Sequence, residues 1–171
     1  MRKWIWVMGF FVVLGVAAQE AEAKLYKKNQ ISVGIGLPLC AFGASGDFAG
    51  GSCISNDFLW FNIPVMYRRR ISPHFAAGGG IMVNIVNAEG FTGAGGELMG
   101  GIRVYALPDF LFFDVNIMLG FPMIFALVPA IGTSIPLGKS FALAFKAEAP
   151  IMFLGGVFGF FQPVVKAEIR F

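Results

Sequence analysis

The sequence predicts an all-β protein: an eight-stranded antiparallel up-and-down transmembrane β-barrel that follows an N-terminal signal peptide. Three observations lead to this prediction. Apolar residues make up 57% of the chain and charged residues 13%, against about 25% charged residues in average soluble proteins. Along much of the chain, apolar residues alternate with small or polar ones, which is the period of a strand with two unlike faces. Beyond the N-terminal segment, prolines and glycines interrupt every apolar run before it reaches the roughly 20 residues of a spanning helix.

The N-terminal segment has the organisation of a secretory signal peptide. Arg2 and Lys3 precede an apolar run from Trp4 to Ala18, and the motif Ala21-Glu22-Ala23 follows. A positive start, an apolar stretch and an A-x-A site occur in this order in cleaved signals. We therefore predict a signal peptide at residues 1–23 and a barrel domain at residues 24–171. Cleavage after Ala18 and an uncleaved anchor are the alternatives.

The chain has two cysteines, Cys40 and Cys53, in a stretch rich in glycine and serine. An exported protein meets an oxidising compartment, so a disulfide between them is the default expectation, and two free thiols are the alternative. The two cysteines have no histidine nearby, so they make a poor metal site. No metal or cofactor is predicted.

Eight segments with strand periodicity account for most of the remaining chain. Each is close to the 9–11 residues that a tilted strand needs to cross a bilayer. An even number closes an antiparallel barrel with both termini at one end, and closure is required in lipid because an open edge leaves backbone groups unsatisfied. The segments are 30–38, 58–68, 75–85, 98–106, 110–120, 126–135, 140–149 and 158–171.

Some features fit this pattern less well. Segment 126–135 shows the weakest alternation. Pro64, Pro129 and Pro163 fall inside predicted strands, where each removes a ladder hydrogen bond. We expect each of these prolines to mark a bulge or an overhanging strand end.

The connections alternate in length. Short turns containing proline, glycine or aspartate follow the second, fourth and sixth segments, whereas the first two intervening connections, residues 40–57 and 86–97, are long. Short periplasmic turns and longer outer loops are typical of outer-membrane barrels. The short turns and both ends of the barrel domain are therefore expected to face the periplasm.

With these features, the chain resembles the small eight-stranded outer-membrane β-barrel proteins of Gram-negative bacteria. The resemblance covers residues 24–171 and rests on the strand pattern and on the ending KAEIRF. It implies residence in the bacterial outer membrane and contact with its lipid. It also implies that the barrel assembly machinery reads Val165, Ala167, Ile169 and Phe171 as a signal. An ordinary closing strand is a compatible reading of the same residues.

The interior of an eight-stranded barrel is just wide enough for side chains to fill it. Charged residues of both signs share the inward parity, and buried charges need partners, so we predict a charge network that plugs the lumen rather than a catalytic acid–base pair. Arg103 is expected near Asp114, and Lys146 and Glu148 near Lys166 and Glu168. Mixed signs argue against an ion-selective ring. The predicted network comprises Arg68, Arg103, Asp114, Lys146, Glu148, Lys166, Glu168 and Arg170.

The resemblance also raises an enzymatic alternative, because some small outer-membrane barrels modify lipid A with a serine or histidine and an acid at the outer rim. The single histidine, His74, lies in a predicted periplasmic turn, at the opposite end. Ser45, Ser52 and Ser55 have no neighbouring histidine to activate them. No catalytic, cofactor-binding or metal residue is predicted, and the protein is predicted not to be an enzyme.

The sequence thus favours a non-enzymatic outer-membrane barrel with a structural or surface-interaction role. The alternative is a narrow pore or transporter for small or hydrophobic molecules, suggested by the glycine-rich lumen. The apolar stretch PIMFLGGVFGFF covers the predicted outer loop 150–157 and the start of the last strand, and it could contact a protein partner near Phe153 and Phe158. A net charge of +3 with scattered basic residues does not indicate nucleic-acid binding.

Overall fold

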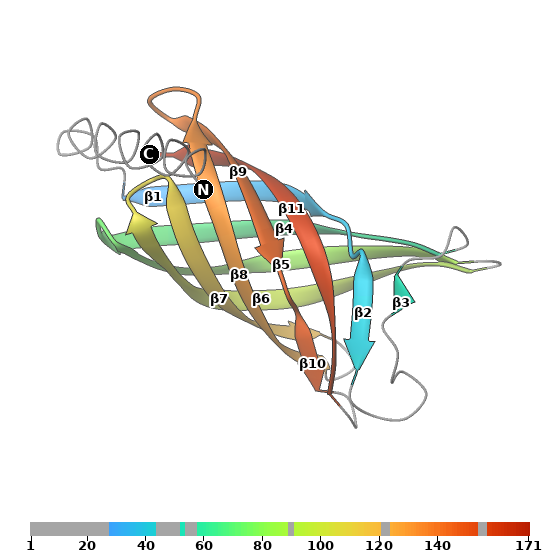
Figure 1. The fold of residues 1–171 in the computed structure, drawn as a ribbon. Helices are drawn as coiled ribbons and strands as arrows, with labels where there is room; N and C mark the ends of the chain where they lie inside the picture. Colours follow the sequence, from blue (N-terminus) through green and yellow to red (C-terminus); the bar gives the residue numbers. More distant parts are fainter. Residues whose placement is uncertain (1–27, 44–51, 54–57, 89–90, 121–123, 154–156) are drawn as a thin grey trace, which may run out of the picture.

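A computed structural model of the protein shows a closed β-barrel (Figure 1). It describes residues 28–43, 52–53, 58–88, 91–120, 124–153 and 157–171. The predicted signal peptide, residues 1–23, lies outside the described residues. Within those described ranges, no helix is long and apolar enough to cross a membrane.

The barrel wall is built from antiparallel neighbours in chain order, and it closes where the first strand pairs with the last. The small strand β2 continues the line of β1, β10 continues that of β9, and β3 pairs with β2. The prediction of an all-β, closed, eight-stranded antiparallel up-and-down barrel is confirmed. The strands are β1 (Asn29–Gly36), β2 (Cys40–Gly43), β3 (Ser52–Cys53), β4 (Phe58–Ser72), β5 (Phe75–Ala88), β6 (Phe91–Leu107), β7 (Leu111–Gly120), β8 (Ile124–Pro136), β9 (Phe141–Glu148), β10 (Ile151–Phe153) and β11 (Val157–Arg170).

The connections agree with the sequence prediction at one end of the barrel only. The turns β4–β5, β6–β7 and β8–β9 are short. They lie at the end of the barrel where β1 begins and β11 ends (Figure 1). At the other end, the prediction of a long loop at residues 86–97 is wrong. Its residues continue β5 and β6 as a paired hairpin, with Asn87 opposite Thr92 and Ala88 opposite Phe91. The glycines at 93, 95 and 96 hide the strand alternation without preventing the backbone from pairing.

This hairpin makes the wall uneven in height. The pairing of β6 with β7 begins only at Glu97, opposite Gly120, so residues 91–96 extend beyond β7. On the other side, β4 follows β5 up to Phe58, opposite Ala88. Strands β4, β5 and β6 therefore project together past their neighbours at the end opposite the turns (Figure 1).

The prolines lie where the ladders are interrupted. Beside Pro64, the β1–β4 ladder has no pairs between Val33–Val65 and Gly36–Asn62. Pro129 faces the break between β9 and β10, where the Ala149 N–H donates to the Pro129 carbonyl over 3.0 Å. At Pro163 the register between β11 and the first wall strand shifts by one residue, from Gly36–Val164 to Cys40–Phe161. Only Pro163 thus marks a change of register, whereas the other two mark local gaps.

The two faces of the wall are chemically opposite. Outward side chains are mainly large and apolar and include Val33, Ile35 and Ile169, which are about half exposed. Inward side chains include arginine, lysine, aspartate and glutamate that are almost fully buried. A soluble protein has the reverse distribution.

The interior has two layers. Toward the turn end lie the charged side chains, together with Ala76, Tyr105, Phe112 and Ala144. Toward the opposite end lies an apolar layer, which we call the methionine layer, and Trp60 packs against it with its ring centroid 4.6 Å from that of Phe160. The methionine layer consists of Met66, Met82, Met99, Met118, Ala126, Val128, Met152 and Phe160.

The close approach of β4 and β5 depends on glycine. A Cβ atom added at Gly80 would overlap the carbonyl oxygen of Val65, whereas at Gly100 the nearest atom would be 3.9 Å away. Gly80→Ala is therefore expected to lower the free energy of unfolding by about 1–3 kcal/mol. Gly100→Ala should change it by no more than about 0.5 kcal/mol. Urea unfolding of the purified protein in detergent measures both, and equal midpoints would contradict the packing described here.

Candidate functional site: the charged lumen

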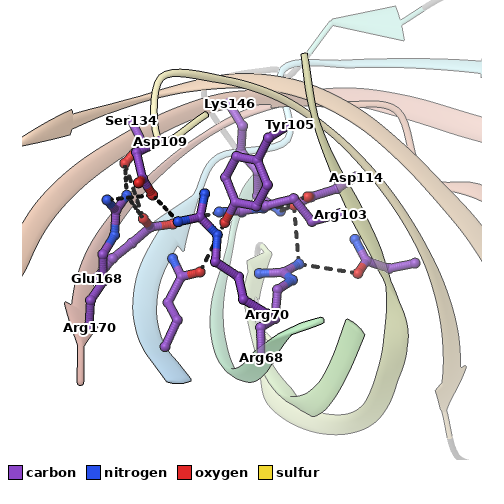
Figure 2. A network of polar contacts seen from close by, with 12 residues as sticks. Arg68, Arg70, Arg103, Tyr105, Asp109, Asp114, Ser134, Lys146, Glu168 and Arg170 are labelled. Carbon is purple, nitrogen blue, oxygen red and sulfur yellow. Dashed lines mark hydrogen bonds and ion pairs between the residues drawn. The ribbon is translucent and has the colours of Figure 1, made fainter. Parts of the chain in front are cut away.

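The most concentrated chemistry of the molecule lies inside the barrel (Figure 2). Period-two alternation points these side chains inward from different strands, and all of them are nearly or fully buried. Because the strands face one another across a narrow lumen, residues far apart in sequence meet there. The central members are Arg68 on β4, Arg103 on β6, Asp114 on β7, Lys146 on β9 and Glu168 on β11.

Asp114 is the hub of this network. Arg103 lies opposite it in the β6–β7 register and donates from Nε to Oδ1 over 2.7 Å and from Nη2 to Oδ2 over 3.0 Å. Oδ2 also accepts from Arg68 Nη2 over 3.1 Å, and the Lys146 ammonium lies 3.8 Å from it. The two parallel bonds from Arg103 form the bidentate pair that arginine and carboxylate geometry favour. One carboxylate thus holds three cations from three strands.

Arg103 extends the network toward the closing strand. Its Nη1 donates to Glu168 Oε1 over 2.9 Å, and its guanidinium lies 3.6 Å from the centroid of the Phe112 ring. The other Glu168 oxygen accepts from Ser134 Oγ and from Arg170 Nη2, each over 3.1 Å. Ion pairs consequently link β4, β7, β6 and β11 across the lumen.

A second group of charges lies at the turn end. Arg70 and Arg170 both pair with Asp109 Oδ1, over 2.7 and 2.8 Å. Asp109 belongs to the β6–β7 turn and adopts a left-handed backbone conformation (φ 54°). Arg70 also lies 4.1 Å above the centroid of the Tyr105 ring (Figure 2). These contacts connect the β6–β7 turn to β4, through Arg70, and to β11, through Arg170.

A polar chain continues on the side of the methionine layer. Gln162 donates to Glu148, and Asn62 donates to Gln162 Oε1 over 2.6 Å. Glu148 also pairs with Lys146 on its own strand. Asn62, Glu148 and Gln162 are 0–2% exposed, so this chain is sealed from solvent.

The expected approach of Lys146 and Glu148 to Lys166 and Glu168 is met by the two lysines, which lie close together, but not by the two glutamates. The β9–β11 register places Lys166 opposite Ala144 and Glu168 opposite Ala142, so charged residues of the two strands do not face one another. Glu168 pairs instead with Arg103 and Arg170. Lys166 lies beside the Lys146 side chain, and its Nζ atom has no hydrogen-bond partner among the described residues.

Sequence reasoning missed several members of the network. Arg70 shares the inward parity of Arg68 and could have been included on that ground. Ser134 also has inward parity, and Asn116 was expected to face inward, but the short polar side chains of both give no sign of their partners. Asp109 could not have been found by parity, because a turn residue has no assigned face.

The residues of the predicted assembly signal lie on the closing strand. Val165, Ala167 and Ile169 point outward opposite Ile35, Val33 and Ile31 of β1. The N–H of Phe171 donates to the Asn29 carbonyl over 3.0 Å, and the Asn29 N–H donates back over 2.9 Å. These residues therefore belong both to the closure of the barrel and to its outer face.

Residues considered for catalysis are scattered. His74 lies in the β4–β5 turn, at the turn end, with its Nδ1 atom 3.0 Å from the Tyr105 carbonyl. Ser52 belongs to β3, whereas Ser45 and Ser55 lie outside the described residues. In the ranges that the structure describes, no group of three or more histidine, cysteine, aspartate or glutamate side chains is arranged to hold a metal ion.

Two further predictions concern the end opposite the turns. The β2–β3 register places Cys40 directly opposite Cys53, and the disulfide itself stays a prediction. Residues 150–157 were predicted as a loop, and this is wrong for Ile151–Phe153, which form β10, and for Val157, which begins β11 opposite Phe153. The strand predicted from residue 158 onward is present. Phe153 is 44% exposed, its ring centroid is 5.6 Å from that of Phe125, and Phe158 lies opposite Gly43 and Met152.

No protein-family model matches the sequence, and no curated protein is significantly similar to it. The functional argument therefore rests on the fold and on the charged lumen.

Removing the hub carboxylate should destabilise the barrel strongly. Asp114→Asn leaves Arg68, Arg103 and Lys146 without their shared counter-charge, and breaking a buried ion pair costs about 3–5 kcal/mol. Glu97→Gln is the matched control, because Glu97 is only partly buried and should change stability by no more than about 0.5 kcal/mol. Urea unfolding in detergent compares the two. Similar losses in both variants would show that the network does not act as a connected unit.

The predicted disulfide can be tested directly. Residues directly opposite in an antiparallel pair have Cα atoms about 4.5–5.5 Å apart, which lies within the range that a disulfide spans. We expect Cys40 and Cys53 to resist maleimide labelling in denaturant until a reductant is added. Cys53→Ser should make Cys40 reactive without reduction. Labelling of the wild type without a reductant would show that Cys40 and Cys53 are free thiols.

Proposed function

We propose that this protein is a non-enzymatic integral β-barrel of the bacterial outer membrane, with a structural or surface-interaction role. One observation supports the proposal above the others: the barrel is apolar outside and charged inside. Ile35, Leu98 and Leu119 are 58%, 63% and 54% exposed, whereas Arg103 and Glu168 are 0% exposed. Exposed apolar surface of this extent favours a lipid environment, because each large apolar side chain left in water forgoes about 1.5–3 kcal/mol of burial energy.

The outward apolar residues encircle the wall instead of forming one patch. They occur on β1, β5, β6, β7, β8, β9 and β11, which agrees with a belt in contact with lipid on all sides. Representative members are Ile31, Val33, Ile81, Ile102, Val115, Ile117, Ile131, Phe145, Val165 and Ile169. A partner protein on one side would need apolar residues on only some strands.

The lumen favours a structural role over a pore. The Arg103 guanidinium bridges Asp114 and Glu168, and the methionine layer fills the next level. Two inward glycines leave no open space at the level of the charges, because an added Cβ at Gly34 or Gly132 would collide with side-chain atoms of Lys166 or of Phe112 and Lys146. The glycine-rich lumen that suggested a transport route is thus occupied by neighbouring side chains.

The surface-interaction part of the proposal is supported by the projecting part of the wall. Residues 91–96 of β6 pair with β5 on one side and, within the described chain, with no strand on the other. A free strand edge is able to accept a strand from another chain. The partner suggested near Phe153 remains a proposal as well, supported by the exposure of that ring beside Phe125.

Heat-modifiable gel migration of cell-envelope fractions tests this proposal. Closed barrels keep their compact shape in detergent until they are boiled, so unboiled protein from the outer-membrane fraction should migrate faster than boiled protein. Phe171→Ser should reduce the fast-migrating fraction, because Phe171 belongs to the predicted assembly signal. Phe113→Ser is the control, since Phe113 is a similarly exposed phenylalanine on β7. Recovery of the wild type in a soluble fraction would refute the proposal.

Planar bilayer recordings separate the structural role from the pore. The structural proposal expects no resolved single-channel steps from the wild type, because the Asp114 network obstructs the lumen. Regular steps would instead favour the narrow pore.

A further inference from the structure

The buried charges of the lumen do not balance. Within the described residues, five buried cations accompany three buried carboxylates, which leaves two positive charges in excess. At the turn end, Arg170 and Asp109, whose side chains are 11% and 20% exposed, add one charge of each sign. The partly buried Glu97 adds one negative charge at the opposite end, on the inward side of β6. The buried cations are Arg68, Arg70, Arg103, Lys146 and Lys166; the buried carboxylates are Asp114, Glu148 and Glu168.

The excess is concentrated around Arg68 and Lys166. Nε and Nη1 of Arg68 and Nζ of Lys166 are buried and have no hydrogen-bond acceptor among the described residues. Both side chains are 1% exposed. Arg68 uses only Nη2, toward Asp114 and Asn116. Three buried donor atoms of charged groups therefore remain available.

The neighbours of these donors are also cationic or donating. Lys146 and Lys166 lie close to each other, and Lys146 and Arg68 approach the same oxygen of Asp114, over 3.8 and 3.1 Å. The Asn116 amide accepts from Arg68 at Oδ1 and leaves its Nδ2 donor without an acceptor. Arg68, Arg103 and Lys146 thus share the Asp114 carboxylate, and Asn116 is bonded to Arg68 beside them.

This arrangement is costly without a further negative charge. Like charges in a low-dielectric interior repel strongly, and a buried cation without a counter-charge carries a desolvation cost of several kcal/mol. Arg103 is also paired with Glu168, and Lys146 with Glu148, but among the described residues no carboxylate pairs with Lys166. Lys166 is held in this position because Gly34 of β1 has no Cβ, which would overlap the lysine side chain.

We propose that the lumen binds a small inorganic monovalent anion, of the halide class, between Arg68 and Lys166. The N–H groups of Arg68 Nε and Nη1 and the Lys166 ammonium donate to the anion, and the Asn116 amide is a further donor. A compact anion suits a lumen that side chains largely fill. The site depends on the closed barrel and its interior charges, so it holds or fails independently of the membrane location proposed above.

The first test is crystallographic. Crystals of the detergent-solubilised protein grown or soaked in bromide should show an anomalous peak inside the barrel, within hydrogen-bonding distance of Lys166 and Arg68. Peaks confined to the outer surface would overturn the proposal. Such a result would mean that one of the two lysines, Lys146 or Lys166, is neutral, or that water molecules accept the hydrogen bonds of the buried donors.

The second test uses thermal stability in solution. A ligand that binds only the folded state raises the melting temperature. The wild type should therefore melt higher in sodium chloride than in sodium gluconate of equal ionic strength, because gluconate is too bulky for the site. Equal melting temperatures in the two salts would contradict anion binding.

Variants locate the effect. Lys166→Met should lose the chloride-dependent shift, and Lys166→Glu should also lose it, because the new carboxylate would supply the missing charge and equalise buried cations and carboxylates. Arg69→Met is the matched control: Arg69 adjoins Arg68 but is exposed on the outer face, and its variant should keep the shift. A shift that survives in both Lys166 variants would place the anion elsewhere and overturn this assignment.

Discussion

The antiparallel ladder between β1 and β11 is the constraint on which the rest of the barrel depends. It runs from Gln30–Arg170 to Gly36–Val164, and Asn29 and Phe171 exchange two backbone hydrogen bonds beyond it. Closure gives the backbone groups of these strands partners on both sides without water. The outer face can then be apolar along its length. The inner face is removed from water at the same time, and this obliges its polar side chains to pair with one another.

The two interior layers fill the barrel with different interactions: ion pairs in one and apolar packing in the other. In the charged layer, Arg103 joins β6, β7 and β11 through directional bonds, which fix the positions of these strands relative to one another. Buried ion pairs add little net stability compared with apolar packing, so their value here is in geometry. In the methionine layer, flexible thioether side chains fill irregular space without imposing directions. One layer orients the wall and the other adapts to it.

Alternation made the fold predictable, and its limits explain what was missed. Every wall strand except the glycine-rich start of β6 had a residue pattern of period two, so strand number and closure could be predicted. Register could not be predicted, because alternation gives the face of each residue but not the offset between neighbouring strands, such as the one that sets Lys166 opposite Ala144. The lumen residues were therefore recognised by parity, but the partners of Lys166 and Glu168 were not. Met82 and Met99 are apolar and could face either the lumen or the outside of the barrel. The methionine layer could therefore not be predicted from the sequence.

The mutual pairing of Asn29 and Phe171 also has a consequence for timing. Local hairpins such as β4–β5 can form as soon as their residues are available, but the seam between β1 and β11 joins the most distant parts of the wall. Contacts of such long sequence separation form slowly, because a large loop must be closed before they contribute. Until the seam forms, β1 and β11 each present an open edge next to an apolar surface, the combination most prone to aggregation. The protein is therefore most prone to aggregation between its synthesis and the pairing of β1 with β11.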